Sequence, residues 1–232
     1  MQCHPTQSFG SIYWKLARLL SLELLLPCPG TGQRTLYITC TLISYSVFFS
    51  VDVTLDPDTA FPKLILSADG KQVTHGDTRQ KLPDNPERFN CCANVLGKEG
   101  FSSGKFCYEV QVRRKTDWDL GVARESINRK ENIMLTPQNG FWTVWLRNGK
   151  QYEACAGHPV PLILRKKPQK VGVFVDYEEG LVSFYDVEAR TLIYSFTGQS
   201  FTEKLYPFFS PCRNDGGKNS APLIISPVHK TE

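Results

Sequence analysis

The segment from Gly140 to Phe184 constrains the fold of this chain more than any other. Residues 140–146 place aromatic and β-branched side chains at alternate positions, and Asn148-Gly149 separates them from a second strand-like run. An Asn-Gly pair between two such runs is the strongest short-range sign of a β-hairpin. Residues 171–177 and 181–185 repeat this strand–turn–strand arrangement. The segment therefore predicts a β scaffold, in which recognition falls to the loops.

The composition fits one β domain of ordinary to large size with some additional sequence. Of the 232 residues, 41% are hydrophobic and 22% are charged, enough for a sizeable core and too apolar for wholesale disorder. The net charge of +4 is small, and the longest basic run, Arg165–Lys167, ends at Pro168. We interpret this run as a solvated loop in preference to a nucleic-acid patch, and we expect no nucleic-acid partner.

The arrangement of the eight cysteines predicts no metal site. No two are spaced as Cys-x-x-Cys, the spacing of zinc sites and of thioredoxin-type redox pairs. Cys107 and Cys155 lie in apolar strand-like runs, where a free thiol behaves as a small buried hydrophobe. The sequence also contains no Asn-x-Ser/Thr glycosylation site. These features favour a reducing compartment, and we expect a cytoplasmic protein without metal or cofactor.

Residues 1–50 differ in character from the rest and are expected to form a short irregular or helical leader. The Leu-rich run 14–26 is interrupted by charges, unlike a signal peptide or a membrane span. Residues 35–51 are uncharged but shorter than the roughly 20 apolar residues that a bilayer helix needs. We expect the leader to be dispensable for the fold. An additional strand or helix against the domain, and a membrane anchor at 35–51, are the alternatives.

From residue 51 onward, short strand-like runs follow one another with a turn about every ten residues. Residues 106–112 alternate apolar and polar side chains, which is typical of a half-buried antiparallel strand. Further runs lie at 63–67, 90–96, 119–123, 191–196, 206–210 and 222–225. No long helical period interrupts them. The pattern predicts an all-β fold, a two-layer antiparallel β-sandwich.

Several motifs of the chain resemble those of a known family. Leu55-Asp56-Pro57 is similar to the signature of a PRY segment. Four later segments resemble the successive motifs of a SPRY domain: Tyr108-Glu109-Val110, Leu120-Gly121-Val122-Ala123, Val175-Asp176-Tyr177-Glu178 and Tyr206-Pro207-Phe208-Phe209. Together they resemble a PRY–SPRY (B30.2) domain of tripartite-motif proteins, including their fish-type expansions, or of butyrophilins. The resemblance implies a concanavalin-like jelly roll with a PRY segment at 51–104 and a SPRY segment at 105–229.

The chain also departs from the tripartite-motif pattern. Proteins of that class carry a RING, a B-box and a coiled coil before this domain, and residues 1–50 show neither zinc-ligand spacing nor heptads. Tyr108 stands where the family commonly has Trp before Glu-Val. We therefore expect a recognition module without its ligase, to which ubiquitin transfer does not carry over. Without a coiled coil we expect no oligomer.

In a sandwich of this class, loops at one end form a shallow binding surface held by rigid strands. We place eight side chains there: Asp117, Trp118, Arg124, Glu125, Trp145, Arg147, Arg213 and Asn214. Trp and Arg are the residue types that most often dominate interface energies. Trp142 is expected in the core, so Trp145, an odd number of residues further along, is expected to face outward. Replacing Trp145 and Arg147 together by alanine is expected to abolish binding and to leave the melting temperature nearly unchanged.

The sequence supplies no catalytic constellation. Its four histidines share no motif with a nucleophile, and there is no Gly-x-Ser-x-Gly elbow. Residues 100–105 resemble a phosphate loop, but their glycine spacing is short and Phe106 stands where Ser or Thr should bind magnesium. Residues 214–218 favour a turn with positive φ, and the acidic residues at 176–179 favour a solvated hairpin. We expect no enzyme.

The resemblance implies a module that recognises a protein surface or a peptide, in innate immunity or in ubiquitin-linked regulation. The alternative is a butyrophilin-like membrane receptor tail that senses a small phosphorylated metabolite. That function would require an anchor at residues 35–51 and a basic pocket. A fragmentary gene product without an independent role is a third possibility.

Overall fold

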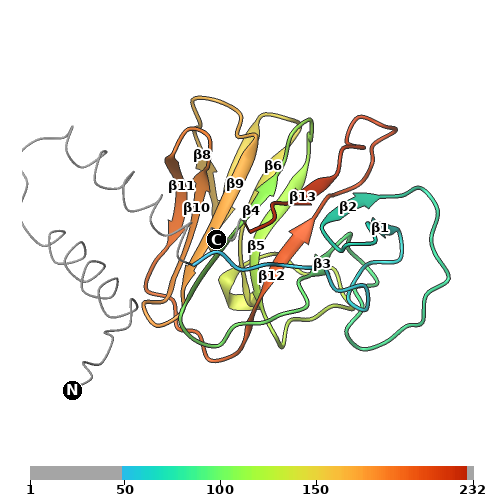
Figure 1. The fold of residues 1–232 in the computed structure, drawn as a ribbon, viewed down its shortest axis with the longest axis horizontal. Helices are drawn as coiled ribbons and strands as arrows, with labels where there is room; N and C mark the ends of the chain where they lie inside the picture. The colour runs from blue at the N-terminus through green and yellow to red at the C-terminus, as the bar shows by residue number, and fades with distance from the viewer. Residues whose placement is uncertain (1–48, 229–232) are drawn as a thin grey trace, which may run out of the picture. The chain divides into compact units, whose positions relative to one another are not determined.

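The computed structural model describes residues 49–228, which form two antiparallel sheets (Figure 1). The seven-stranded sheet contains, in spatial order, β1 (Leu64–Leu66), β2 (Gln72–His75), β13 (Leu223–Ile225), β4 (Lys105–Gln111), β9 (Lys170–Asp176), β10 (Leu181–Asp186) and β11 (Thr191–Phe196). The six-stranded sheet contains β3 (Val95–Leu96), β12 (Leu205–Ser210), β5 (Trp118–Arg124), β6 (Phe141–Arg147), β7 (Gln151–Cys155) and β8 (Pro159–Leu162). A 3-10 helix, η2 (Pro137–Asn139), precedes β6. The predicted all-β sandwich is confirmed.

The expectations for the leader fall outside the described residues, apart from its last two positions. Among the strands, the run predicted at 90–96 is much shorter in the structure. Only Val95 and Leu96 form β3, which pairs with β12, because residues 90–93 adopt bends. The predicted Asn-Gly hairpin is present between β6 and β7. Asn148 and Gly149 both adopt positive φ, at 53° and 69°, and Arg147 pairs with Gln151 across a three-residue loop.

The main core lies between the sheets and follows the alternation of the strands. On β6, Trp142, Val144 and Leu146 point inward and are at most 5% exposed, and Trp145 lies on the other face, half-buried. Both expected orientations of the tryptophans are thus confirmed. Alternate valines of β9, together with Val182 and Phe184 of β10, complete the core from the opposite sheet. This packing makes the strands a rigid support for the loops.

Two of the family-like motifs connect the sheets to each other. The Tyr108 hydroxyl on β4 donates a 2.5 Å hydrogen bond to the carbonyl oxygen of Gly121 on β5. A Cβ atom at Gly121 would lie 2.0 Å from the carbonyl oxygen of Trp142, so only glycine fits this close approach. Burial raises the pKa of the Tyr108 hydroxyl, which keeps it protonated as the donor.

A smaller apolar cluster covers part of the outer face of the six-stranded sheet. Phe141 and Phe208 project from the sheet and pack edge to face, with ring centroids 5.4 Å apart. Phe89 and Ile127, from the loops at 76–94 and 125–136, pack over them. The cluster lies toward the Arg124 end of β5. Trp145 lies on the same face, nearer the other end of the strands.

Candidate binding site

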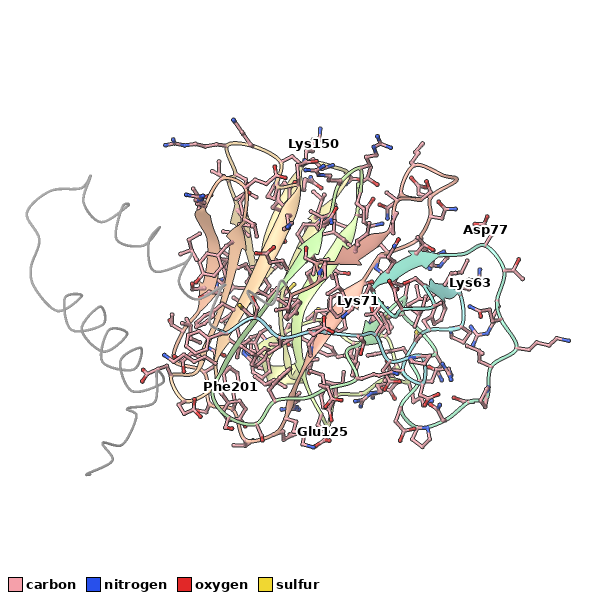
Figure 2. All side chains as sticks on the ribbon, viewed as in Figure 1. Lys63, Lys71, Asp77, Glu125, Lys150 and Phe201 are labelled. Atoms are coloured by element: carbon pink, nitrogen blue, oxygen red, sulfur yellow. The ribbon has the colours of Figure 1, made fainter. Side chains whose placement is uncertain are left out.

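The eight predicted side chains divide between two ends of the six-stranded sheet. β5 runs from Trp118 to Arg124, a span of about 20 Å for seven residues of extended chain. Asp117 and Trp118 lie at its start, near the β6–β7 turn, and Arg124 with Glu125 lies at its finish. Figure 2 shows Lys150 and Glu125 at opposite ends of the molecule, and we call these the Lys150 end and the Glu125 end. The single cluster expected from the sequence is therefore wrong for Arg124 and Glu125.

Trp118 is also misassigned, because its side chain belongs to the core. It is 1% exposed and packs edge to face against Tyr152, with ring centroids 6.3 Å apart. Trp118 points to the same face of β5 as Leu120 and Val122, which are fully buried. A side chain this deeply buried contributes to the stability of the core. Only its backbone faces the site, where its carbonyl oxygen accepts a hydrogen bond from Arg147.

Arg147 forms an ion pair with a buried carboxylate that the sequence analysis did not single out. Its Nη2 lies 2.6 Å from Oδ1 of Asp119, whose side chain is 7% exposed. Nη1 of Arg147 donates to the carbonyl oxygens of Trp118 and Leu146, at 3.1 and 2.8 Å. Burial raises the pKa of the Asp119 carboxyl, and the guanidinium opposes that shift. The guanidinium is therefore already committed within the domain.

Trp145 lies directly against this ion pair on the outer face of the sheet. The guanidinium carbon of Arg147 is 4.9 Å from the centroid of the Trp145 ring, a cation–π contact. Trp145 stands opposite Asp119 on β5 and Glu153 on β7 in the strand register. We call these four side chains, Asp119, Trp145, Arg147 and Glu153, the Trp145 face. The expectation that replacing Arg147 leaves the melting temperature unchanged conflicts with this geometry.

The loops beside the Trp145 face are held by Asn219, which the sequence analysis also missed. Asn219 is 2% exposed, and its side chain reaches five backbone groups at 2.9–3.2 Å. It accepts from the N–H groups of Thr116 and Asp117 and donates to the carbonyl oxygens of Asp117, Pro211 and Arg213. The β12–β13 loop is thereby fixed to the β4–β5 loop.

The other predicted residues at the Lys150 end have different local roles. The Asp117 carboxylate accepts from the backbone N–H of Asn148 at 3.1 Å and so fixes the β6–β7 turn. Asn214 donates to the Asp77 carboxylate at 3.3 Å. Arg213 is exposed. Of the predicted side chains at this end, Arg213 alone is exposed and makes no side-chain hydrogen bond or ion pair within residues 49–228.

Arg124 and Glu125 belong to a separate cluster at the Glu125 end. Nε of Arg124 lies 3.8 Å from Oε1 of Glu203, and the Glu125 carboxylate accepts from the Tyr206 hydroxyl at 3.1 Å. Hydrogen bonds from Ser126 lower the pKa of the Glu203 carboxyl. A small cavity of about 80 Å³ lies beside Arg124. The Arg124 guanidinium is thus paired with a carboxylate of the domain.

The described part of the chain, residues 49–228, holds no group of three or more His, Cys, Asp or Glu side chains arranged for a metal ion. Over the same residues, no helix combines the length and the apolar character that a membrane span requires. The Lys150 end offers one aromatic face on a rigid sheet, bordered by loops that are fixed by buried hydrogen bonds.

Two packed antiparallel sheets whose loops gather at their ends define the class of β-sandwich domains. The model of the SPRY domain matches residues 105–224, and the model of the SPRY-associated domain, PRY, matches residues 53–101. The chain belongs to the SPRY domain family, in its PRY–SPRY form.

Individual relatives agree with this assignment. The human erythroid membrane-associated protein is 49% identical over 183 residues, covering 78% of this chain. The human E3 ubiquitin-protein ligase TRIM68 is 44% identical over 207 residues, covering 89% of this chain. The chain spans only 38% and 41% of the lengths of these two relatives. The crystal structure of the TRIM65 PSpry domain superposes with a TM-score of 0.68 at 22% identity, covering 88% of this chain and 100% of that domain, which shows the shared fold.

Proposed function

We propose that this chain recognises a protein surface or a peptide through the Trp145 face. The observation that supports this best is the way Trp145 is held. A half-buried indole on a central strand contacts Arg147, which is itself fixed by the buried Asp119 carboxylate. An aromatic side chain that is ordered before binding loses little conformational entropy when a partner covers it. More of the burial energy is then available for affinity.

We further propose that the chain is the target-recognition part of a tripartite-motif-like protein in the cytoplasm, in ubiquitin-linked regulation or innate immunity. A relative named as an E3 ubiquitin-protein ligase supports the ubiquitin link. SPRY domains act as binding modules, so we assign recognition to this chain and no transfer chemistry. Cys91, Cys92, Cys155 and Cys212 are free thiols, which suits a reducing compartment.

The second candidate, a butyrophilin-like receptor tail for a small phosphorylated metabolite, has support from the membrane-associated relative. It requires a compact basic pocket that matches a small ligand. Exposed cations in the described residues spread over several loops of the Lys150 end, at Arg114, Arg165, Lys166, Arg213 and Lys218. This spread favours a longer ligand and hence the first candidate.

The test begins with peptides selected for the full chain from a random display library. The selected peptides are then titrated against Trp145→Ala and against Leu192→Ala as the matched control. Leu192 is 47% exposed on β11, in the other sheet, and its truncation removes apolar surface away from the Trp145 face. Trp145→Ala should weaken binding about 30-fold or more, the effect of losing one interface hot spot. The assignment would be refuted if no selected peptide bound Trp145→Ala more weakly than wild type.

A further inference from the structure

Five loops meet at the Lys150 end, and backbone and side-chain contacts tie most of them together. The backbone N–H of Gly149 in the β6–β7 turn donates to the carbonyl oxygen of Thr116 in the β4–β5 loop, at 2.8 Å. Lys167 of the β8–β9 loop donates to the carbonyl oxygen of Lys115, at 2.5 Å. Asn219 fixes the β12–β13 loop to the same segment. The β10–β11 turn joins through the Arg113–Glu188 ion pair.

These loops carry a strong excess of positive charge. Residues 112–117, 148–150, 163–169, 187–190 and 211–222 contain ten Lys or Arg and three Asp or Glu. The excess of seven exceeds the net charge of the whole chain, +4. The loops that join strands at the Glu125 end, residues 97–104, 125–140, 177–180 and 197–204, contain four Lys or Arg and six Glu. The domain is therefore electrostatically polarised, with its positive end beside the Trp145 face.

Most of these cations have no counter-charge within the domain. Lys115 is fully buried, and its Nζ donates to the carbonyl oxygens of Asn219 and Ala221, at 3.2 and 2.9 Å. Arg113 is paired with Glu188, although both side chains are at least half exposed. The remaining exposed cations form no ion pair with residues 49–228: Arg114, Lys150, Arg165, Lys166, Lys167, Arg190, Arg213 and Lys218.

A groove of about 570 Å³ runs between two of the charged loops. Its floor is formed by Gln111 of β4 and Ile224 of β13, which are paired in the strand register. Arg113 and Arg114 line one side, and Lys218 lies on the β12–β13 loop opposite. Gln111 belongs to the seven-stranded sheet, whereas Trp145 belongs to the six-stranded sheet. The groove is thus a surface distinct from the Trp145 face.

The chemistry of the groove fits a chain of anionic groups. An arginine guanidinium binds carboxylates and phosphates through paired hydrogen bonds, and a lysine supplies a point charge. Single-stranded nucleic acid would in addition need aromatic side chains on which bases can stack. The five loops contain no Phe, Tyr or Trp. An extended peptide with several carboxylates or phosphates can follow the groove and also reach the cations that surround it.

We propose that the groove between Arg113, Arg114 and Lys218 binds an anionic peptide segment. The segment is Asp/Glu-rich or phosphorylated, and it belongs to a partner that the Lys150 end attracts. This site does not depend on the Trp145 face, so either assignment can fail alone. Binding through exposed charges is expected to be fast, because the charges attract the peptide before contact. It is expected to weaken steeply with salt, because dissolved ions screen charges that are exposed to solvent.

The experiment measures fluorescence anisotropy of the full chain with three labelled peptides of otherwise identical sequence. One carries Glu at alternate positions, one carries phosphoserine there, and one carries Gln. The Glu or the phosphoserine peptide should bind and the Gln peptide should not, and the stronger of the two anionic peptides identifies the source of the charge. The test variant is Arg114→Asn with Lys218→Ser. Asn suits position 114, whose φ is +61°. This variant should weaken binding at least about tenfold, since it removes two charge-assisted contacts.

The matched control, Lys98→Ser with Lys204→Ser, removes two exposed cations at the Glu125 end and should leave affinity within about twofold, since screened charges contribute little at that distance. Trp145→Ala should also retain the affinity, which separates this site from the Trp145 face. Four results would overturn the proposal. The first is that neither anionic peptide binds, and the second is an equal loss of affinity in the test and control variants. The third is that inorganic pyrophosphate displaces the labelled peptide as well as unlabelled anionic peptide does. The fourth is that an RNA oligonucleotide binds more tightly than the peptides, with the same dependence on Arg114 and Lys218.

Discussion

Replacing Arg147 by methionine should lower the free energy of unfolding by about 2–3 kcal/mol. The substitution keeps an apolar stem of similar length but removes the guanidinium that lies 2.6 Å from the Asp119 carboxylate. Losing one partner of a fully buried ion pair costs about 3–5 kcal/mol, because the other charge stays buried. The value is smaller here because 33% of the Arg147 side chain is exposed and water already screens the pair.

The assay is thermal and urea denaturation of wild type, Arg147→Met, Asp119→Asn and the double variant. In a domain of this size, the expected loss corresponds to a fall in Tm of about 4–12 °C for Arg147→Met. The double variant should lose less than the two single variants together, by about 1–2 kcal/mol, because an amide at position 119 carries no charge that needs a partner. Additive losses across this cycle would refute the claim that Asp119 and Arg147 stabilise each other.

The pH dependence supplies an independent check of the same pair. Burial raises the pKa of the Asp119 carboxyl in the folded state, so protonation of this group favours the folded state. Removing Arg147 raises that pKa further, since the opposing positive charge is lost. The deficit of Arg147→Met relative to wild type should therefore be largest at neutral pH and shrink as the pH falls. A deficit that is constant over this range would exclude a charged Asp119 as its cause.

Two other predictions concern the loops of the Lys150 end. Burial lowers the pKa of Lys115 from its ordinary 10.5 to about 8, so the unfolded chain holds this proton more tightly than the folded one. Between pH 8 and 10.5 the unfolding free energy of wild type should therefore rise relative to that of Lys115→Met, by up to about 3 kcal/mol. Urea denaturation of both proteins over this pH range measures the effect. A difference in unfolding free energy that does not change with pH would contradict the prediction. Asn219→Ala should cost about 2–4 kcal/mol, because five backbone groups lose their partner, whereas Asn214→Ala, with one exposed contact, should cost less than about 0.5 kcal/mol. Hydrogen exchange at the amides of Thr116 and Asp117 should accelerate only in the former, and equal rates in both variants would contradict the role of Asn219.

The sequence predicts the parts of this fold that depend on local pattern. The period of two along residues 141–147 correctly orients Trp142 and Trp145, and Asn148-Gly149 correctly marks a hairpin, because both signals lie within one segment. The same period could have placed Trp118 in the core with Leu120 and Val122. The predicted strand starts at Asp119, one residue after Trp118, whereas the observed strand begins at Trp118.

The candidate site is less predictable because it depends on which strands become neighbours. Asp119 lies next to Arg147 only because β5 and β6 pair in a particular register. Turn rules fix the register of strands joined by short loops, and the connection between β5 and β6 is too long for such rules to apply. Asn219 lies about a hundred residues from Thr116 along the chain, so no spacing motif joins them. The separation of Arg124 from Arg147 likewise follows from the direction of β5 and not from the order of residues.

The hydrogen bonds of Asn219 have a consequence for how this domain can change its specificity. They hold the carbonyl oxygens of Pro211 and Arg213, so the Asn219 amide fixes main-chain atoms of this segment and not its side chains. Gly216 and Gly217 adopt φ of 61° and 94° and have to stay, whereas Arg213 and Lys218 are exposed and can be exchanged with little penalty to folding. One scaffold can therefore be redirected to new partners by rewriting the exposed side chains of this loop, provided that its glycines and the single amide beneath it are retained.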